Sequence, residues 1–399
     1  MTITTTNDQS TSTLMTTEVL IIGAGPAGSA CAISLQKAGV DCIVADKAAF
    51  PRFKLCGGLI TQKGQDCLRE VLGNDAYEQC MEVCVRGREQ YFALWDECKR
   101  IVRVKLDNNI VLIDRPTMDN WLVQHYKSLG GRIMEGNGVK SIDFAAHVAV
   151  LESGEEVSYK KLVAADGVHS PVAHMLADAD KRYKLNKKGC FCLEVFVDEK
   201  DCDIEDVNIH FNLVPNFYTW AFKKGNQVAI GLGKLTTDKI DIKEVLIDYM
   251  KRMGVRQGAE QASAPIRGAV IPSEVRQAEW KSADVLFAGD AGGFVELLTY
   301  EGIYYAIRSG SYAAQSIISG TSYTQLVRPM HRKMQYGSFF QKFIYWKPFL
   351  NIMCKYGSTH GAFIAKFYAD NIDNIPSKPL WKQIAIVLMK TVRVAVKRK

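Results

Sequence analysis

The stretch EVLIIGAGPAG, residues 18–28, decides the fold of this chain of 399 residues. Its first five residues have the short apolar pattern of a buried strand, and a glycine-rich loop follows at once. In this G-x-G-x-x-G loop, Gly23 permits a tight turn, Gly25 lets the backbone approach a pyrophosphate, and Gly28 lets the next helix pack on the strand. We predict that this helix runs to about Lys37, with an N-terminus that offers free N–H groups to phosphates.

A second predicted strand, Asp41 to Asp46, completes a β-α-β unit. Asp46 ends this strand 18 residues after Gly28, where a carboxylate can accept both hydroxyls of a ribose. The context of strand, glycine loop, helix and acidic strand end predicts a dinucleotide site. The alternative is a glycine-rich turn that binds no ligand.

The motif AGDAGGF, residues 288–294, favours FAD over NAD as the dinucleotide. Asp290 follows a predicted buried strand, inside a loop of small residues that suits the ribityl and pyrophosphate part of FAD. We predict a helix from Tyr300 to Ser319 behind this loop, with its positive end near Gly302 and aimed at the N1–C2 edge of a flavin. Taken alone, the motif is also compatible with an ordinary strand-to-turn segment.

Strands of period two between Cys190 and Leu235 indicate a second, separate sheet. The predicted fold class is therefore α/β: a Rossmann-type FAD-binding domain interleaved with a mixed β-sheet substrate domain, plus a helical, basic C-terminal extension. The predicted boundaries are 1–17 for a disordered lead-in, 18–85, 110–185 and 280–322 for the discontinuous FAD-binding domain, 86–109 and 186–279 for the substrate domain, and 323–399 for the basic, aromatic-rich helical C-terminal region.

With the element ADGVHS at residues 165–170, these motifs resemble the FAD-dependent group exemplified by p-hydroxybenzoate hydroxylase. More narrowly, the chain resembles the geranylgeranyl reductase family over residues 17–320. The narrower likeness rests on P-R-x-K-x-C-G-G at 51–58, on Y-x-W-x-F at 218–222 followed by Lys224 and G-x-G at 231–233, and on G-D-A-x-G-F-V-x-x-x-T-x-E-G-I at 289–303.

This resemblance implies an isoprenoid substrate whose isolated C=C bonds are reduced by hydride from the flavin. It implies FAD contacts near Ala27, Asp46, Cys56, Gly57, Arg115, Asp290, Gly302 and Ile303. The chain departs from the family pattern at Leu297 and Tyr300, which replace a usual Pro and Gly. These bulky residues predict a changed space beside the isoalloxazine, and they affect the substrate more than the cofactor.

Two further sets of residues are candidates for the chemistry. Cys56 lies between Lys54 and two glycines, so it is a candidate to donate a proton or to form a labile disulfide; the alternative is a small residue that fits a tight loop. Tyr218, Trp220 and Phe222 alternate and are predicted to share one face of a strand, either as the wall of a prenyl pocket or as ordinary sheet core.

The basic charge of the chain is concentrated at its C-terminal end. From residue 322 onward there are 14 Lys and Arg against 2 Asp, a balance of +12 that leaves −5 for the rest. Aromatic residues at 339–350 and a mixed apolar and basic end at 380–399 predict peripheral contact with a membrane, or else a helix packed on the body with a basic outer face. No nucleic-acid motif accompanies the charge, and no stretch has the ~18 apolar residues of a spanning helix.

The eleven cysteines include no C-x-x-C pair, and Cys80, Cys84, Cys190, Cys192 and Cys202 have no His partner at zinc-finger spacing, so we expect no metal site. We expect a reduced, cytoplasmic setting. The basic C-terminal end adds the expectation of peripheral attachment to the inner face of the membrane. The predicted function is FAD-dependent reduction of C=C bonds in a prenyl lipid. Electrons would come from an external donor, a nicotinamide nucleotide or an electron-transfer protein. The alternatives are an FAD-dependent monooxygenase of an apolar or aromatic substrate, and a membrane-associated flavin-binding protein with a tolerance or regulatory role.

Overall fold

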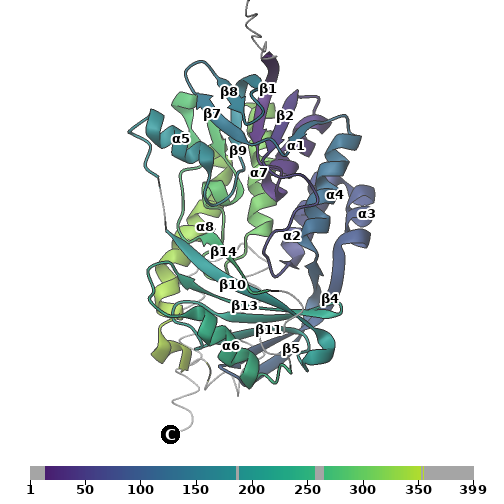
Figure 1. Ribbon diagram of the computed structural model, residues 1–399, viewed down its shortest axis with the longest axis vertical. Helices are drawn as coiled ribbons and strands as arrows, with labels where there is room; N and C mark the ends of the chain where they lie inside the picture. Colours follow the sequence, from purple (N-terminus) through teal and green to yellow (C-terminus); the bar gives the residue numbers. More distant parts are fainter. Residues whose placement is uncertain (1–13, 186–187, 257–264, 352–353, 355–399) are drawn as a thin grey trace, which may run out of the picture.

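Two eight-stranded sheets organise the protein, sheet A in the upper half of Figure 1 and sheet B in the lower half. Of the 399 residues, the computed structural model describes 14–185, 188–256, 265–351 and 354. The chain passes between the two sheets several times, so each sheet is assembled from segments far apart in the sequence.

Sheet A has the strand order β15-β16-β9-β1-β2-β6, with β8 pairing β9 and β7 pairing β8. The five strands β16, β9, β1, β2 and β6 are parallel, as in a Rossmann-type sheet. The strands are β1 (Leu14–Ile22), β2 (Cys42–Asp46), β6 (Arg132–Glu135), β7 (Val139–Asp143), β8 (Val148–Leu151), β9 (Glu156–Ala164), β15 (Glu279–Trp280) and β16 (Val285–Phe287).

Sheet B has the strand order β14-β10-β13-β12-β11-β4-β5-β3 and is mixed, because β11 pairs β4 in parallel while its other pairs are antiparallel. The period-two strands expected between Cys190 and Leu235 are confirmed as β10, β11, β12 and β13, which are neighbours in this sheet. The strands are β3 (Leu59–Ile60), β4 (Val85–Asp96), β5 (Lys99–Ile113), β10 (Gly189–Asp198), β11 (Val207–Phe211), β12 (Thr219–Lys224), β13 (Gln227–Leu235) and β14 (Arg267–Pro272).

Helices cover both faces of sheet A, and sheet B carries a helix on its outer side (Figure 1). One apolar core lies between sheet A and helices that include α1, α4 and α7; a second lies on the other face of sheet A with α5; the third joins sheet B to α6. The helices are α1 (Pro26–Lys37), α2 (Gln62–Leu72), α3 (Asn74–Cys84), α4 (Arg115–Ser128), α5 (Pro171–Ala179), α6 (Ile242–Arg252), α7 (Ile303–Ser319) and α8 (Tyr323–Ile344), with short 3₁₀ turns η1 (Glu199–Asp201), η2 (Lys281–Ala283) and η3 (Gly289–Gly292). Within the described ranges, none of these helices combines the length and apolar character required to cross a bilayer.

The first strand starts earlier than the sequence predicts. Residues 14–17, expected at the end of a disordered lead-in, belong to β1 because they pair in parallel with residues 156–159 of β9. The Thr-rich composition that indicated disorder also suits a strand once a partner is available. The rest of the predicted lead-in, residues 1–13, lies outside the described part of the chain.

One predicted domain boundary also differs. Residues 110–113 were assigned to the FAD-binding domain, but they form the end of β5 in sheet B, where they pair with β3 and with the start of β4. Strand β5 is 15 residues long, and both of its halves pair with β4, with a shift of register between Glu89 and Tyr91. The assignment of the two sheets to cofactor and substrate stays a prediction.

The C-terminal region is helical over α8, and the residues that follow pack on the body. Tyr345, Phe349 and Leu350 are buried against the core of sheet B, and the Tyr345 hydroxyl donates to the Leu298 carbonyl at 2.7 Å. The aromatic segment at 339–350 was expected either at a membrane interface or packed on the body, and these three residues pack on the body because sheet B offers them an apolar surface. Trp346 is 56% exposed. The basic end at 380–399 lies outside the described residues.

Candidate active site

The glycine loop between β1 and α1 is held by close backbone packing at two of its glycines. Gly23 has a φ of +100°, and a Cβ there would lie 2.4 Å from the Ala165 carbonyl oxygen. A Cβ on Gly28 would lie 1.8 Å from the Gly23 carbonyl oxygen. The loop therefore closes against the end of β9 only because these positions carry no side chain.

Gly25 differs from the other two glycines because it faces open space. A Cβ there would meet only the Arg52 guanidinium, at 3.4 Å. Gly25 is also the N-cap of α1, and no side chain among the described residues caps that helix end. Uncapped N–H groups, the positive end of the helix dipole and a guanidinium thus converge on one space, which fits the diphosphate of FAD.

Asp46 binds the glycine loop itself. Its Oδ2 accepts from the Ala24 N–H at 2.7 Å, and its Oδ1 accepts from the Ala48 N–H at 2.8 Å. The carboxylate is therefore fixed at the end of β2 by two backbone donors, and each oxygen retains a lone pair. The contact of Asp46 with a ribose stays a prediction, and the structure adds that Asp46 positions the loop.

The second motif lies directly against the first. Helix α7 crosses α1 so closely that a Cβ on Gly310 would lie 2.0 Å from the Ala27 carbonyl oxygen. The Ala27 methyl lies 3.0 Å from the Cβ position of Gly289, at the start of η3. The structure thus brings the GxGxxG loop and the Asp290 motif together, although more than 250 residues separate them in the sequence.

Asp290, Gly302 and Ile303 meet at the N-terminus of α7. The Asp290 Oδ1 lies 4.0 Å from the Cβ position of Gly302, which is the N-cap of α7. The helix was expected to start at Tyr300, but it begins at Ile303 because Tyr300 has a φ of +54°, which is outside the helical region. The flavin contacts of these residues stay predictions.

Arg115 occupies a buried ion pair beside Cys56. Its Nε and Nη2 each donate to a carboxylate oxygen of Asp119 at 3.0 Å, and Asp119 also lies 3.6 Å from the Arg52 guanidinium. Burial acts to lower the pKa of Arg115, but the Asp119 carboxylate and the Cys56 thiol outweigh burial, and the net shift is upward. Arg115 is therefore a buried cation, fixed by a carboxylate of its own helix α4 and close to Cys56.

Cys56 is half-buried and has a free thiol. Its sulfur accepts from the Gly58 N–H at 3.4 Å, so the side chain folds back on its own loop. Gly57, the next residue, lies against sheet B: a Cβ there would be 3.0 Å from the Phe222 ring and 3.4 Å from the Trp220 Nε1. The loop of residues 56–58 thus lies where the two sheets meet.

Tyr218, Trp220 and Phe222 form an aromatic row on the side of sheet B that faces this loop. Trp220 and Phe222 are buried next to Gly57, and the Tyr218 and Trp220 rings meet edge to face with centroids 6.2 Å apart. The Tyr218 hydroxyl donates to the Thr299 carbonyl, which joins the row to the loop that precedes α7. The prediction that these residues contact a substrate stays open, but the structure places them beside the Cys56 loop.

Two glycines make room for Trp220 of this aromatic row and for the neighbouring Phe217. A Cβ on Gly231 would lie 2.2 Å from the Trp220 ring, and a Cβ on Gly233 would lie 2.7 Å from the Phe217 ring. Both glycines lie on β13, next to β12. The G-x-G at 231–233 is therefore explained by packing, since the Trp220 and Phe217 rings lie against β13 where a side chain would collide with them.

Leu297 and Tyr300 direct their bulk toward α8. Leu297 is fully buried, with its Cβ 3.7 Å from the Cβ position of Gly337 on that helix. The Tyr300 hydroxyl accepts from the Gln341 side-chain amide on α8 and from the Cys190 thiol at 3.0 Å, and its ring packs on Phe217. The two departures from the family pattern thus pack the C-terminal helix onto the loop before α7.

Two buried charged groups lie beside the aromatic row: Glu194, which sequence reasoning missed, and Lys224, which it named only as part of the family motif. Glu194 on β10 is 1% exposed and accepts from the Trp220 Nε1 at 3.1 Å. Lys224, at the end of β12, is 9% exposed, and its ammonium lies 5.3 Å from the centroid of the Phe196 ring. A Glu within the apolar run GCFCLEVFVD was the available signal, because a charged residue in a buried strand calls for a partner or a function.

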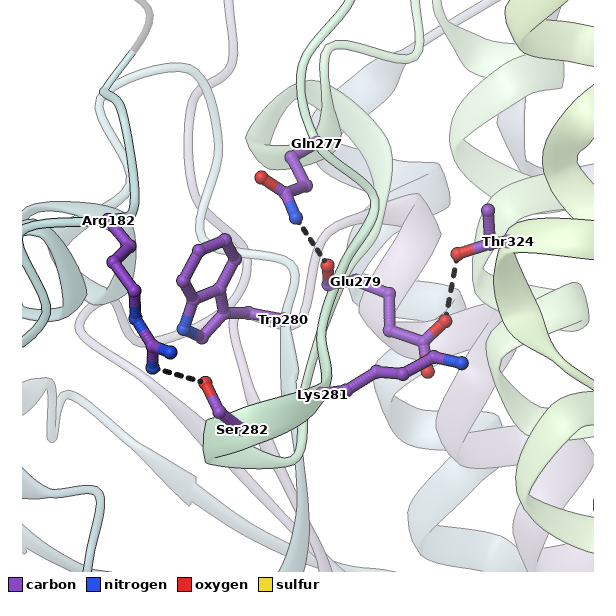
Figure 2. A pocket seen from close by; sticks show the side chains of 7 residues that line it. All are labelled: Arg182, Gln277, Glu279, Trp280, Lys281, Ser282 and Thr324. Atoms are coloured by element: carbon purple, nitrogen blue, oxygen red, sulfur yellow. Dashed lines mark hydrogen bonds between the residues drawn. The ribbon is translucent and has the colours of Figure 1, made fainter.

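A separate pocket of about 370 Å³ opens beside the edge strand β15 (Figure 2). Its polar lining is tied together by hydrogen bonds from Thr324 to the Glu279 carboxylate at 2.8 Å and from Gln277 to the Glu279 carbonyl at 3.0 Å. The lining residues are Arg182, Gln277, Glu279, Trp280, Lys281, Ser282 and Thr324. None of them is a predicted cofactor or substrate residue, so this pocket is distinct from the candidate active site.

Known proteins are similar to this chain in sequence. The FAD binding domain family matches residues 16–181. An uncharacterized protein of Methanosarcina barkeri is 28% identical over 76% of this chain and 74% of its own length. A geranylgeranyl diphosphate reductase of Rhodobacter capsulatus is 26% identical over 76% of this chain and 75% of its own, and a menaquinone reductase of Mycobacterium tuberculosis is 27% identical over 76% of each.

Solved structures show the same fold. A geranylgeranyl bacteriochlorophyll reductase-like protein of Thermoplasma acidophilum has a TM-score of 0.70 at 18% identity, over 84% of this chain and 89% of that one. A probable FAD-dependent monooxygenase of Pseudomonas aeruginosa has a TM-score of 0.63 at 13% identity, over 84% and 99%. The glycine loop, the uncapped helix α1 and the match to the FAD binding domain family agree on one cofactor, FAD. The chain is an FAD-binding oxidoreductase whose residues 16–181 match the FAD binding domain family and whose relatives include geranylgeranyl reductases.

Proposed function

We propose that this enzyme reduces C=C bonds of a prenyl chain. The observation that carries the proposal is the aromatic row of Tyr218, Trp220 and Phe222, which lies directly against the Cys56–Gly57 loop where the two sheets meet. Aromatic side chains bind flexible hydrocarbon chains by apolar contact and leave a small number of polar groups to fix orientation. Relatives named geranylgeranyl diphosphate reductase and menaquinone reductase support a prenyl substrate.

The residues of the chain have separable tasks in this reaction. Bound FAD supplies the hydride. The uncapped N-terminus of α1 and Arg52 hold its diphosphate, and Asp46 fixes the loop that surrounds it. The aromatic row excludes water and orients the prenyl chain beside the Cys56 loop. An isolated alkene is not polarised, so a proton must reach the second carbon inside a dry site.

The test uses the complete protein with FAD, photoreduced without oxygen. We expect fast reoxidation on mixing with a prenyl lipid such as geranylgeranyl diphosphate or menaquinone, accompanied by a saturated product seen by mass spectrometry. We expect slow reoxidation by O₂ alone. Comparing the two lipids identifies the headgroup that the site accepts, since both carry prenyl C=C bonds.

Monooxygenation of an apolar substrate is the second candidate, because the fold is shared with a probable FAD-dependent monooxygenase. Fast reoxidation by O₂, with an oxygen atom incorporated into an apolar substrate and no saturated prenyl product, would replace the reductase proposal. The electrons come from an external donor in either reaction, for which we propose a nicotinamide nucleotide or an electron-transfer protein.

We also propose peripheral attachment to an anionic membrane through the basic end of the chain. The seven Lys and Arg at residues 378–399 have no acidic residue among them. Such clusters are attracted to anionic lipid headgroups. A prenyl-lipid substrate would be supplied from the same surface.

A further inference from the structure

The Glu194 carboxyl group is buried with one oxygen unused. Its Oε1 accepts from the Trp220 indole N–H at 3.1 Å. Its Oε2 is inaccessible to solvent and has no hydrogen-bond partner among the described residues. Burying a carboxylate with an unsatisfied oxygen is unfavourable, whereas a protonated carboxyl is far less costly to bury.

The sheet register brings Trp220 to Glu194 from two strands away. Glu194 on β10 lies opposite Gly231 on β13, and Gly231 lies opposite Trp220 on β12. Because Gly231 has no side chain, the Trp220 ring extends across β13 and reaches the carboxyl group. The pair is therefore a built feature of sheet B that depends on one glycine.

This pair lies under the loop at residues 56–58. The Trp220 Nε1 is 3.4 Å from the Cβ position of Gly57, and the Lys224 ammonium is 3.3 Å from that of Gly58. The Cys56 backbone N–H is close enough to the Glu194 carboxyl group to lower its pKa. Glu194 is thus next to the loop that bears the candidate flavin contacts Cys56 and Gly57, and next to the aromatic row.

The local electrostatics keep the proton available near neutral pH. Burial raises the pKa of Glu194 to about 7, against the opposing influence of the Trp220 N–H, the Lys224 charge and the Cys56 N–H. Burial lowers the pKa of Lys224, while Cys56 and Glu194 act to raise it. Cys192, on the same strand, is a further titratable neighbour, and burial keeps its thiol protonated by raising its pKa. Arg267, the register partner of Glu194 on β14, lies instead over the Phe53 ring.

We propose that Glu194 is the proton donor for the C=C reduction, with Trp220 as the residue that positions it. The proposal rests on the proposed function. In the step, the π bond of the alkene breaks, a hydride from reduced FAD forms one C–H bond, and the Glu194 O–H breaks to give its proton to the other carbon. FAD is oxidised and the alkene is reduced. The carboxylate then recovers a proton from water, and the external donor returns two electrons to FAD.

The test compares the photoreduced wild type with Glu194→Gln, mixed with geranylgeranyl diphosphate or menaquinone in single turnovers. A general acid contributes about 10²–10⁴-fold, so we expect Glu194→Gln to slow prenyl reduction by that factor with its FAD content unchanged. In the wild type the rate should fall as the pH rises through about 7, because the acid form is required. In Trp220→Phe the fall should move to higher pH, because an interaction that lowers the pKa is lost.

A readout independent of turnover comes from infrared spectroscopy of the FAD-loaded protein. The carbonyl stretch of a protonated carboxylic acid should disappear as the pH rises through about 7 in the wild type and should be missing from Glu194→Gln. Glu89→Gln is the matched control: Glu89 is a partly buried Glu on β4 of the same sheet whose pKa burial also raises, and it has no place in the site. We expect this control to keep the wild-type rate.

The outcomes separate the two proposals. If the wild type reduces a prenyl lipid and Glu194→Gln does so equally fast, the proton donor is another group and only the Glu194 assignment is overturned. A wild-type infrared spectrum without a titrating carboxylic acid would overturn it as well. If the wild type reduces neither lipid, the reductase function fails and the assignment fails with it.

Discussion

The indole ring of Trp220 lies directly over Gly231, so that a Cβ on this glycine would be 2.2 Å from the ring. The contact joins three strands of sheet B, because the same ring donates to Glu194 on the far side. It therefore connects the packing of the sheet to the candidate active site.

Gly231→Ala should displace Trp220 and break its bond to Glu194. Overpacking of this kind costs ~1–3 kcal/mol of unfolding free energy. We expect a large loss of prenyl reduction with FAD still bound, measured by single-turnover kinetics and flavin absorbance. Gly87→Ala on β4 is the control, since a Cβ there meets its nearest atom at an ordinary 3.4 Å. Equal effects of the two substitutions would show that the Trp220 contact has no special role.

Gly25 and Gly28 should respond differently to substitution. A side chain at Gly25 enters the open space in front of α1, so Gly25→Val should fold and lose FAD. A Cβ at Gly28 collides with the backbone at 1.8 Å, so Gly28→Ala should lose stability with or without the cofactor. Thermal melts of the apoproteins and flavin release on denaturation measure the two effects. Full flavin content in Gly25→Val would disprove the phosphate-loop assignment.

Asp119→Ala should strongly destabilise the protein. Asp119 is fully buried, and its removal leaves the buried Arg115 guanidinium without its bidentate partner. Breaking one side of a buried pair costs ~3–5 kcal/mol. Asp66→Ala removes the partner of Arg69 at an exposed pair and should cost less than ~1 kcal/mol. Denaturant titration of both variants measures the difference, and similar costs would contradict this account.

Acid should destabilise the folded state through His210. The ring is buried, bonds the Glu97 carbonyl at 2.7 Å and the Tyr249 hydroxyl at 2.8 Å, and burial lowers its pKa from 6.5 to about 4. Between pH 6.5 and 4 the unfolded chain binds the proton and the folded chain does not, so stability falls as the pH falls, by up to ~1.4 kcal/mol per pH unit.

Glu194 acts in the opposite direction, because its raised pKa means that the folded state binds the proton first as the pH falls below about 7. The two contributions are separated by comparing the wild type with His210→Gln. The stability that the wild type has over this variant should shrink as the pH falls from 6.5 to 4. A difference independent of pH would contradict a neutral, buried His210.

The basic end of the chain should bind anionic vesicles. We expect the complete protein to co-sediment with such vesicles, less at high salt, at ~1 kcal/mol for each basic residue that reaches the surface. A truncation before Ser377 removes seven Lys and Arg and should bind more weakly while keeping its FAD. A full-length variant with those seven replaced by Gln controls for the loss of chain. Equal binding by all three forms, or loss of flavin on truncation, would overturn the proposal.

Local patterns in the sequence were sufficient to predict several features of the protein. The strand, glycine loop and helix at residues 18–37 and the Asp290 motif are short segments in which residue type dictates backbone geometry, and they led to the Rossmann-type sheet and to FAD. The alternation of Tyr218, Trp220 and Phe222 likewise predicted a shared face, since side chains in a strand repeat every two residues.

Features that depend on strand register and on packing between distant segments became visible in the folded protein. Residues 14–17 form a strand because β9 pairs with them, and β5 crosses the predicted domain boundary because both of its halves pair with β4. Tyr345, which follows α8, packs on sheet B, and Leu297 and Tyr300 pack toward α8. Glu194 lies within reach of Trp220 because the strand between them carries Gly231, which has no side chain to block the indole ring. Such a contact links residues that no local pattern relates, so its chemistry arises only when the sheet has formed.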